Sequence, residues 1–232
     1  MTLSVIPITG IGDVLPGADL AGAIVDAVRA HEPVRGDVLV VTHKVVSKAE
    51  GAVAMLEDDG PDGHRELVER EAASILRRRG SLVIAETRHG LVCANAGVDR
   101  SNASPGTAVL LPRDPDASAH RLRIRLQQVF GIDIAVIISD TFGRAWRRGL
   151  IDVAIGCSGL DAILDLKGTR DWSGRQLEVT EVAVADELAS AADLVMGKAS
   201  GIPAALIRGY SGPRGEGRAA DLIRPVAEDM FR

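Results

Sequence analysis

The sequence predicts a mixed α/β (α+β) protein, in which strands and helices alternate along the chain. Two observations predict this class. Residues 5–8, 38–42 and 134–139 are short β-branched or aliphatic runs with the length of strands. Segments between them, such as residues 19–31, carry apolar side chains at the spacing of one helix face. The length suits one large domain or two small ones, and because neither predicted loop is long enough to be a linker, we expect residues 1–232 to form a single domain.

The N-terminal segment predicts a strand, a helix and a second strand. Residues 5–8 are expected to form the first strand and residues 38–42 the second. The helix between them spans residues 19–31, and its apolar face consists of Leu20, Ile24, Val25 and Val28. Lys44 and Lys48 lie four residues apart, so they share one face of a helix that directly follows the second strand.

The next segment predicts a loop, a helix and a strand. Residues 57–63 are rich in Asp and Gly and contain a Pro, which is typical of turns. Residues 64–79 place Arg and Glu opposite an apolar stripe, so we expect a helix that lies on a sheet. The stripe consists of Leu67, Val68, Ala72, Ile75 and Leu76. Residues 82–85 are mostly aliphatic and predict a strand.

The C-terminal half continues the alternation. A helix is expected to begin after Asp114, an N-cap residue that precedes Pro115, and to end at Gly131. Residues 134–139 are almost purely aliphatic, which predicts a strand buried on both faces. The remaining predicted elements are a strand at residues 177–182, a helix at 186–196, a strand at 204–207 and a loop at 210–217.

The composition argues against two kinds of partner. The 27 basic and 32 acidic residues give a net charge of −5, so there is no basic field for a nucleic-acid backbone. Aromatic residues make up only 3% of the chain, too few for base-stacking platforms. No segment approaches the roughly 20 apolar residues that a membrane-spanning helix needs. We therefore expect neither a nucleic-acid nor a membrane partner.

The cysteines and the N-terminus predict a cytoplasmic protein. Cys93 and Cys157 are too few for a disulfide framework or a four-thiolate zinc site, which favours a reducing compartment. We expect both to be small core residues rather than nucleophiles. The N-terminal residues lack the basic region and long apolar segment of a secretory signal.

The familiar nucleotide and hydrolase motifs are missing from the sequence. Gly10 and Gly12 have no third glycine at the dinucleotide-binding spacing, and Gly197-Lys198 lacks the upstream glycine of a Walker A loop. The five histidines show no zinc-ligand spacing, and there is no Gly-x-Ser-x-Gly elbow. Any chemistry must therefore come from other polar clusters.

Two polar clusters follow the first two predicted strands. The first is TGIGDV at residues 9–14, whose glycines allow close approach of an anion to the backbone, although a plain tight turn explains it equally well. In the second, Lys44 and Lys48 lie near a helix start, where positive charge is unfavourable unless an anion binds. A phosphate site and a solvated basic face both remain open here.

Two further clusters contain carboxylates. Asp99 and Asn102 lie in one loop, for which an Asx turn is the simplest structural explanation. Asp140 and Thr141 end the buried strand, and both are hard oxygen ligands suited to magnesium or manganese. Three arginines follow within eight residues and could bind phosphate or carboxylate oxygens. A purely structural cap with surface arginines is the alternative.

Together these motifs resemble the coenzyme F420-0:L-glutamate ligase (F420-0 gamma-glutamyl ligase) family, over nearly the whole chain. The resemblance rests on four segments in the family's order: VTHKVVSKAEG at 41–51, AGVDRSN at 96–102, SDTFGRAWR at 139–147 and ADELASAADLVMGK at 185–198. It implies the family's α/β fold, an intertwined homodimer, and the stand-alone form without a C-terminal flavin-reductase-like domain.

The resemblance also implies an activity and its ligands. Members use GTP to join L-glutamate to the terminal carboxylate of coenzyme F420-0 through a gamma-linked amide and an acyl-phosphate intermediate. They need a divalent metal, Mg²⁺ or Mn²⁺, and often K⁺. Carried over by motif, the implied metal ligands are Asp99, Asp140 and Thr141. The implied GTP contacts are Ile11, Gly12, Asp13, Val14, His43, Lys48 and Asn102.

The chain departs from the family pattern in two places. His43 stands where relatives commonly have Ser, and residues 197–203 are less acidic than the matching segment of archaeal members. Two alternative functions stay open at this point. One is a GTP-binding regulatory module without ligase chemistry, and the other is an amide ligase of the same mechanism that acts on another carboxylate.

Overall fold

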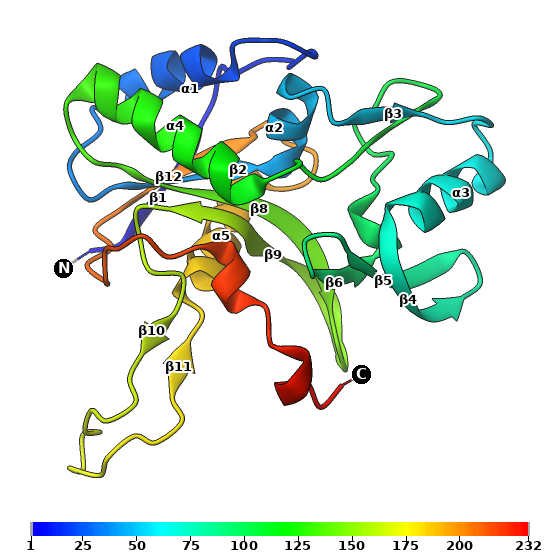
Figure 1. Cartoon of the computed structure of the whole chain (residues 1–232). Helices are drawn as coiled ribbons and strands as arrows, with labels where there is room; N and C mark the ends of the chain where they lie inside the picture. Colours follow the sequence, from blue (N-terminus) through cyan, green and yellow to red (C-terminus); the bar gives the residue numbers. More distant parts are fainter. Residues whose placement is uncertain (1, 232) are drawn as a thin grey trace.

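A five-stranded sheet forms the centre of the computed structural model, which describes residues 2–231 (Figure 1). The strand order is β1 (Ser4–Ile8), β12 (Ala204–Arg208), β2 (Val38–Thr42), β8 (Ala135–Arg144) and β9 (Arg147–Ser158). β2 and β8 run parallel, and the other neighbouring pairs run antiparallel. The carboxyl end of β2 therefore lies beside the middle of β8, with Thr42 paired to Ser139.

Helices cover both faces of this sheet. α1 (Leu20–Arg29) and α4 (Pro115–Phe130) pack on the face that carries Leu39 and Val41, and α5 (Val184–Met196) packs on the face that carries Val38 and Val40. Figure 1 shows α1 and α4 on one side of the sheet and α5 on the other. Because successive strand residues point to opposite faces, a strand between two helical layers is apolar throughout. The predicted mixed α/β class and the doubly buried strand are both confirmed.

A smaller antiparallel unit projects beside the main sheet. It consists of α3 (Pro61–Glu71) and the sheet β4 (Ala72–Arg79), β5 (Leu82–Thr87) and β6 (Val92–Ala94), followed by the 3-10 turn η1 (Asn95–Gly97). Leu67, Val68, Val83 and Ala85 are among the residues of its own apolar core. β3 (Val53–Met55) pairs with β7 (Thr107–Val109) where the chain enters and leaves this unit.

The predicted helix at residues 64–79 is wrong in its second half. The helix begins earlier, at Pro61, so residues 61–63 belong to it and not to the predicted loop, and it ends at Glu71. The residues that follow form β4, which pairs antiparallel with β5. Leu67 and Val68 are buried, but Ile75 from the same predicted stripe is 38% exposed. Pairing with β5 satisfies the backbone of this segment and outweighs its helical periodicity.

The predicted strand at residues 177–182 is correct only at its end. β11 (Glu181–Val182) pairs with β10 (Leu164–Asp165), and the chain between them forms an arm, residues 164–182, that extends away from the body (Figure 1). Turns hold the rest of the arm together, such as the one in which Asp171 accepts the amides of Ser173 and Arg175. Backbone hydrogen bonds also join Leu177 to Gly168 and Thr169 across the arm, but only Glu181 and Val182 pair in the regular register of a strand.

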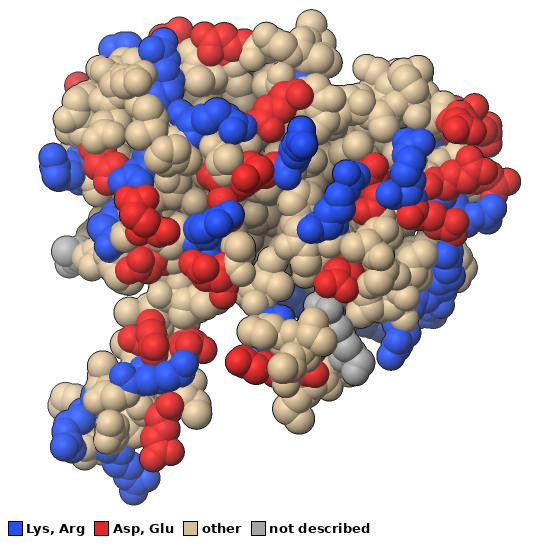
Figure 2. All heavy atoms as spheres, in the orientation of Figure 1, with Lys and Arg blue, Asp and Glu red and all other residues tan. Residues whose placement is uncertain are grey.

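The remaining elements are α2 (His43–Ala49) and two short 3-10 turns, η2 (Ala219–Leu222) and η3 (Val226–Glu228). Cys93 and Cys157 are free and buried, and burial raises the pKa of each thiol to about 12. The prediction that both are core residues is confirmed. Among the helices of residues 2–231, none has both the length and the apolarity to span a bilayer. Figure 2 shows basic and acidic side chains interspersed over the face in view.

Candidate active site

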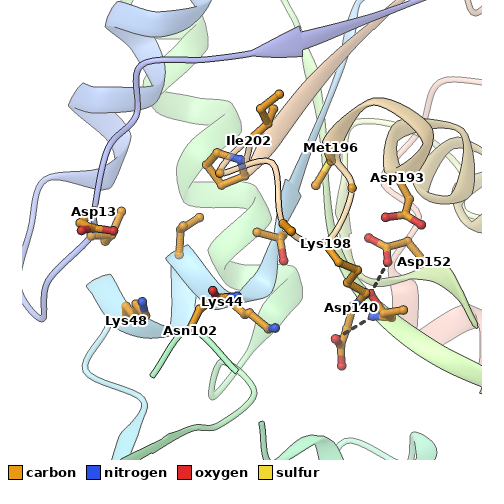
Figure 3. A pocket seen from close by; sticks show the side chains of 18 of the residues that line it. Asp13, Lys44, Lys48, Asn102, Asp140, Asp152, Asp193, Met196, Lys198 and Ile202 are labelled. Carbon is orange, nitrogen blue, oxygen red and sulfur yellow. Dashed lines mark hydrogen bonds between the residues drawn. The ribbon is translucent and has the colours of Figure 1, made fainter. Parts of the chain in front are cut away.

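A cavity of about 300 Å³ opens where β2 ends beside Asp140 and Thr141 of β8, and the carboxyl end of a parallel strand is where open α/β sheets bind ligands. Its walls come from the loop before α1, from α2, from the β8–β9 hairpin and from the end of α5 with the loop that follows (Figure 3). The charged side chains that line it are Lys44, Lys48, Lys198, Asp13, Asp140, Asp152 and Asp193. Opposite charges therefore share one small space.

Five of the seven residues predicted to contact GTP line this cavity: Gly12, Asp13, Val14, Lys48 and Asn102. The other two do not. The Ile11 side chain belongs to the apolar core under α1 and α4, and the His43 imidazole is fully buried against Asp140. Any contact between a cavity ligand and these two positions would have to come from backbone atoms.

The glycine loop leaves its backbone open to the cavity. Gly12 adopts a left-handed conformation with φ of 71°, which favours glycine. No atom lies within 4 Å of the position that a Cβ on Gly12 would occupy. This open approach is what close contact between a ligand and the backbone requires.

The two lysines of α2 have different surroundings. Lys44 Nζ lies 2.7 Å from Asp99 Oδ2 and also donates to the Ser101 hydroxyl. Lys48 forms no ion pair within residues 2–231, although it lines a cavity that contains four aspartates. Both lysines are half-buried at the cavity wall, so they do not form a fully solvated basic face.

Asp140 is held as a carboxylate by two neighbours. Its Oδ1 lies 3.2 Å from His43 Nε2 and accepts the Thr141 amide at 2.7 Å. Burial raises the pKa of Asp140, but these two contacts outweigh burial and bring the pKa below its ordinary value. The Ser47 hydroxyl lies 3.2 Å from His43 Nδ1, one turn along α2, and this contact orients the ring.

Asp99, unlike Asp140 and Thr141, is not among the residues that line the cavity; it is ionised and forms the predicted Asx turn. Its Oδ1 accepts the Ser101 amide at 2.6 Å, while Lys44 contacts the other oxygen. Burial raises the pKa of Asp99, but Lys44 and Ser101 outweigh it and lower the pKa. The negative charge of Asp99 in turn acts to raise the pKa of Asp140, because the two carboxylates repel one another electrostatically.

The donor chemistry of Asp99, Asp140 and Thr141 fits a hard divalent cation. Two mutually repelling carboxylates and a hydroxyl offer the oxygen ligands that magnesium and manganese prefer. Ammonium groups already contact two of these ligands: Lys44 pairs with Asp99, and Lys198 donates to the Thr141 hydroxyl. Within residues 2–231 no three His, Cys, Asp or Glu side chains are grouped for a metal, so a cation here would also need ligands from substrate or water.

Three charged cavity residues were given no role from the sequence: Asp152, Asp193 and Lys198, of which the last two lie in the motif at residues 185–198. Asp152 lines the cavity because β9 pairs with β8 and places Asp152 opposite Thr141. Its carboxylate accepts hydrogen bonds from the hydroxyls of Ser139, at 2.8 Å, and Thr141. A hairpin prediction for residues 139–158 would have found this pairing. Asp193 and Lys198 come from α5 and its exit loop, and only the packing of α5 on the sheet brings them here.

The arginines that follow Thr141 lie outside the cavity. Arg144, Arg147 and Arg148 belong to the far end of the β8–β9 hairpin, and the Arg144 guanidinium donates to the Arg148 carbonyl at 2.7 Å. Because β8 continues for several residues past Asp140, these guanidinium groups are carried away from the pocket. Lysines therefore supply the positive charge that lines it.

Comparison with known proteins decides the family. A sequence model described as F420-0:Gamma-glutamyl ligase matches residues 10–209, a range that contains every residue lining the cavity. The chain belongs to the F420-0:gamma-glutamyl ligase family.

Within this family, the chain is similar over its whole length to proteins named "Coenzyme F420:L-glutamate ligase". It is 45% identical to the one from Methanopyrus kandleri, over 100% of this chain and 98% of that protein. It is 44% identical to the one from Methanothermobacter thermautotrophicus, over 100% of both chains, and 40% identical to the one from Archaeoglobus fulgidus, over 100% and 97%. The family resemblance predicted from the sequence motifs is thus confirmed.

Proposed function

We propose that this chain is a GTP-dependent ligase that joins L-glutamate, through a gamma-linked amide, to the terminal carboxylate of coenzyme F420-0 in the biosynthesis of coenzyme F420. The observation that carries this proposal is the full-length similarity to proteins named as ligases of coenzyme F420 and L-glutamate. The matched range also encloses a cavity in which lysines and aspartates meet at the ligand-binding edge of the sheet.

The reaction needs an activated carboxylate. A carboxylate does not react with an amine at neutral pH, because hydroxide is a poor leaving group. Transfer of the GTP gamma-phosphoryl group to the F420-0 carboxylate gives an acyl phosphate, and the glutamate amine then displaces phosphate. Both steps bring anionic groups together, so fixed positive charge must lie between them.

The cavity residues and the neighbouring Asp99, which contacts Lys44, divide this work. Lys48 and the open backbone near Gly12 bind the GTP phosphates, and Asn102 contacts the nucleotide. Asp99, Asp140 and Thr141 hold a divalent cation, Mg²⁺ or Mn²⁺, which when bound neutralises charge between the phosphates and the acceptor carboxylate. The buried His43 imidazole contacts Asp140 and keeps that carboxylate ionised and oriented.

Product analysis by liquid chromatography with mass detection tests the activity. With GTP, L-glutamate, Mg²⁺ and F420-0, the product should gain the mass of one glutamyl unit, and omission of GTP should abolish it. GTP binding without any mass gain would support a regulatory GTP-binding module instead. A gain seen only with a different carboxylic acid acceptor would support an amide ligase of another substrate.

We also propose that the chain forms an intertwined homodimer. The arm extends from the body, and Trp172 at its far end is completely exposed, as is most of Val179. The tip of the β8–β9 hairpin likewise exposes Trp146, which packs on Phe231 with ring centroids 5.0 Å apart. Exposed aromatic side chains on projecting elements favour burial against a partner, and a second copy of this chain is the partner that the family resemblance implies.

The dimer is tested by sedimentation equilibrium at micromolar protein concentration. The expected mass is twice the 24.4 kDa of the chain. A single species with the mass of one chain at these concentrations would contradict the dimer without affecting the proposed reaction.

A further inference from the structure

The carboxylates in the cavity differ in what already contacts them. Asp140 lies against His43 and accepts the Thr141 amide. Asp152 accepts two hydroxyl groups, from Ser139 and Thr141. Protein donors thus already occupy both carboxylates. A substrate group would have to compete with these donors for either of them.

Two other cavity carboxylates, Asp13 and Asp193, accept no hydrogen bond and form no ion pair in the part of the chain that the structure describes. Asp13 is exposed on the loop before α1 and lies on the same side of the cavity as Lys48 (Figure 3). Asp193 is half-buried on the opposite side, near Asp152 and Lys198. The cavity therefore has one free carboxylate on each side.

Helix α5 fixes the position of Asp193. The Ser190 hydroxyl, one turn earlier, donates to the backbone carbonyl of Asp152 at 2.7 Å. Asp186, a further turn back, accepts the Ala154 amide at 2.9 Å. Residues spaced by three and four share one face of a helix, so this face of α5 is tied to β9 and holds Asp193 at the cavity wall.

The surroundings of Asp193 favour proton uptake. Burial raises its pKa, the nearby charge of Asp152 raises it further, and Lys198 only partly opposes them. Lys198 donates to the Thr141 hydroxyl, so its ammonium group is already engaged on the side of the predicted metal ligands. Asp193 thus combines an open carboxylate with a raised proton affinity.

The ligase reaction requires such a group. The amine of free glutamate carries its proton at neutral pH, and an ammonium ion has no lone pair to attack an acyl phosphate. A proton acceptor must therefore contact the amine, and the acceptor must not itself be neutralised by fixed donors. A carboxylate also attracts the positive charge of the incoming ammonium group.

We propose that Asp193 binds the ammonium group of L-glutamate and acts as the general base that frees it for attack; this rests on the function proposed above. A proton passes from nitrogen to an Asp193 carboxylate oxygen, and the nitrogen lone pair forms the C–N bond. The C–O bond to phosphate breaks, and phosphate leaves with the bonding electrons. The second nitrogen proton goes to the departing phosphate, and Asp193 releases its proton to solvent before the next turnover.

The test compares Asp193→Asn with wild type, using two nucleophiles. L-Glutamate needs deprotonation, whereas hydroxylamine is largely unprotonated at neutral pH and traps the acyl phosphate as a hydroxamate without a base. We expect the variant to lose about 100-fold or more in kcat with glutamate. Its rate of hydroxamate formation from GTP and F420-0 should stay within about threefold of wild type, because proton removal is not needed there.

Two controls make the comparison specific. Glu187→Gln removes an exposed carboxylate from the same helix outside the cavity and should change neither rate. Asp193→Glu, which keeps a carboxylate, should recover part of the activity with glutamate. The wild-type kcat should fall as the pH drops through the pKa of Asp193. The charged groups that face Asp193 are Asp152 on β9 and Lys198 on the loop after α5. In Asp193→Asn this acid limb should be missing.

Several results would overturn the inference. Equal loss with glutamate and with hydroxylamine would assign Asp193 to phosphoryl transfer or folding, and unchanged kcat with glutamate would remove it from catalysis. If the wild-type protein itself forms neither glutamyl product nor hydroxamate, the proposed function fails and this inference fails with it. A defect confined to the variant concerns Asp193 alone.

Discussion

At the scale of single residues, acidic and basic side chains offset one another in and beside the cavity, and each predicted metal ligand already has a partner. Lys44 contacts Asp99, His43 lies against Asp140, and Lys198 contacts Thr141. A cation that entered this region would have to replace the two ammonium contacts. His43 differs from the lysines because it is fully buried, so it can stay in place and support Asp140 from behind.

Lys48 is the cavity lysine whose ammonium has neither an ion pair nor a side-chain hydrogen bond in the described chain, since Lys44 contacts Asp99 and Lys198 contacts Thr141, so it is available to phosphate. Lys48→Ala should weaken GTP binding by about 10-fold to 100-fold, the effect of losing one charge-assisted hydrogen bond. Isothermal titration calorimetry measures this affinity. Arg65→Ala, which removes an exposed cation from α3, is the matched control and should bind GTP as wild type does. Unchanged affinity in Lys48→Ala would remove Lys48 from the phosphate site.

Asp140→Asn removes the charge of a proposed metal ligand while it keeps the shape of the side chain. The rate of glutamyl transfer should fall by about 100-fold or more, which corresponds to about 3 kcal/mol in the barrier. Steady-state assays measure the rate, and thermal unfolding monitored by circular dichroism checks that the variant is folded. A folded variant with full GTP-dependent activity would refute the metal assignment.

Cavity residues could be predicted from the sequence where a short local motif carries them. Gly12, Lys48 and Asn102 line the cavity as the motifs suggest, because each lies in a loop or helix that directly follows a strand or 3-10 turn. Asp152 and Lys198 could not be placed in this way. Their positions depend on the β8–β9 register and on the packing of α5, which are long-range contacts that no local pattern contains.

At the scale of elements, the sequence predicted helix boundaries correctly where capping residues mark both ends of the helix. The helix predicted at residues 114–131 begins after Asp114 and ends at Gly131, whose φ of 68° suits a left-handed C-terminal residue. The segment at residues 64–79 failed because no stop signal separates α3 from β4. For a few positions its apolar residues fit the spacing of a helix and also that of a strand, and pairing with β5 makes the segment a strand.

The start of α4 offers a test of stability at this scale. The Asp114 side chain accepts the Ala117 amide at 3.0 Å, which satisfies one of the free donors at the helix start. Asp114→Ala should lower the free energy of unfolding by about 1 kcal/mol, and Asp114→Asn, which keeps an acceptor, should lower it by only a few tenths. Urea denaturation measures both. Equal destabilisation by the two substitutions would contradict the capping role.

At the scale of the whole molecule, the core was the most predictable feature and the projecting parts the least. The strands at residues 38–42 and 134–139 are apolar throughout because helices cover both faces of the sheet. The smaller unit and the arm depend instead on antiparallel pairings between short, partly exposed strands. Such strands are stabilised by their neighbours more than by their own composition.

The architecture also explains why the cavity lies where it does. β2 and β8 are parallel neighbours, so the end of β2 brings His43 and Lys44 beside Asp140 and Thr141 of β8. β12, which pairs with the other side of β2, begins just after the loop that carries Lys198. One edge of the sheet therefore gathers groups from the start, the middle and the end of the chain.

The central claim is that GTP and a divalent cation bind together in this cavity. Crystals soaked with Mn²⁺ and GDP test it most directly, because manganese is located by its anomalous scattering. The account predicts a manganese ion in contact with Asp99 and Asp140, and a diphosphate beside Lys48. A nucleotide and metal bound elsewhere, such as in the separate cavity lined by His89 and Arg113, would contradict it.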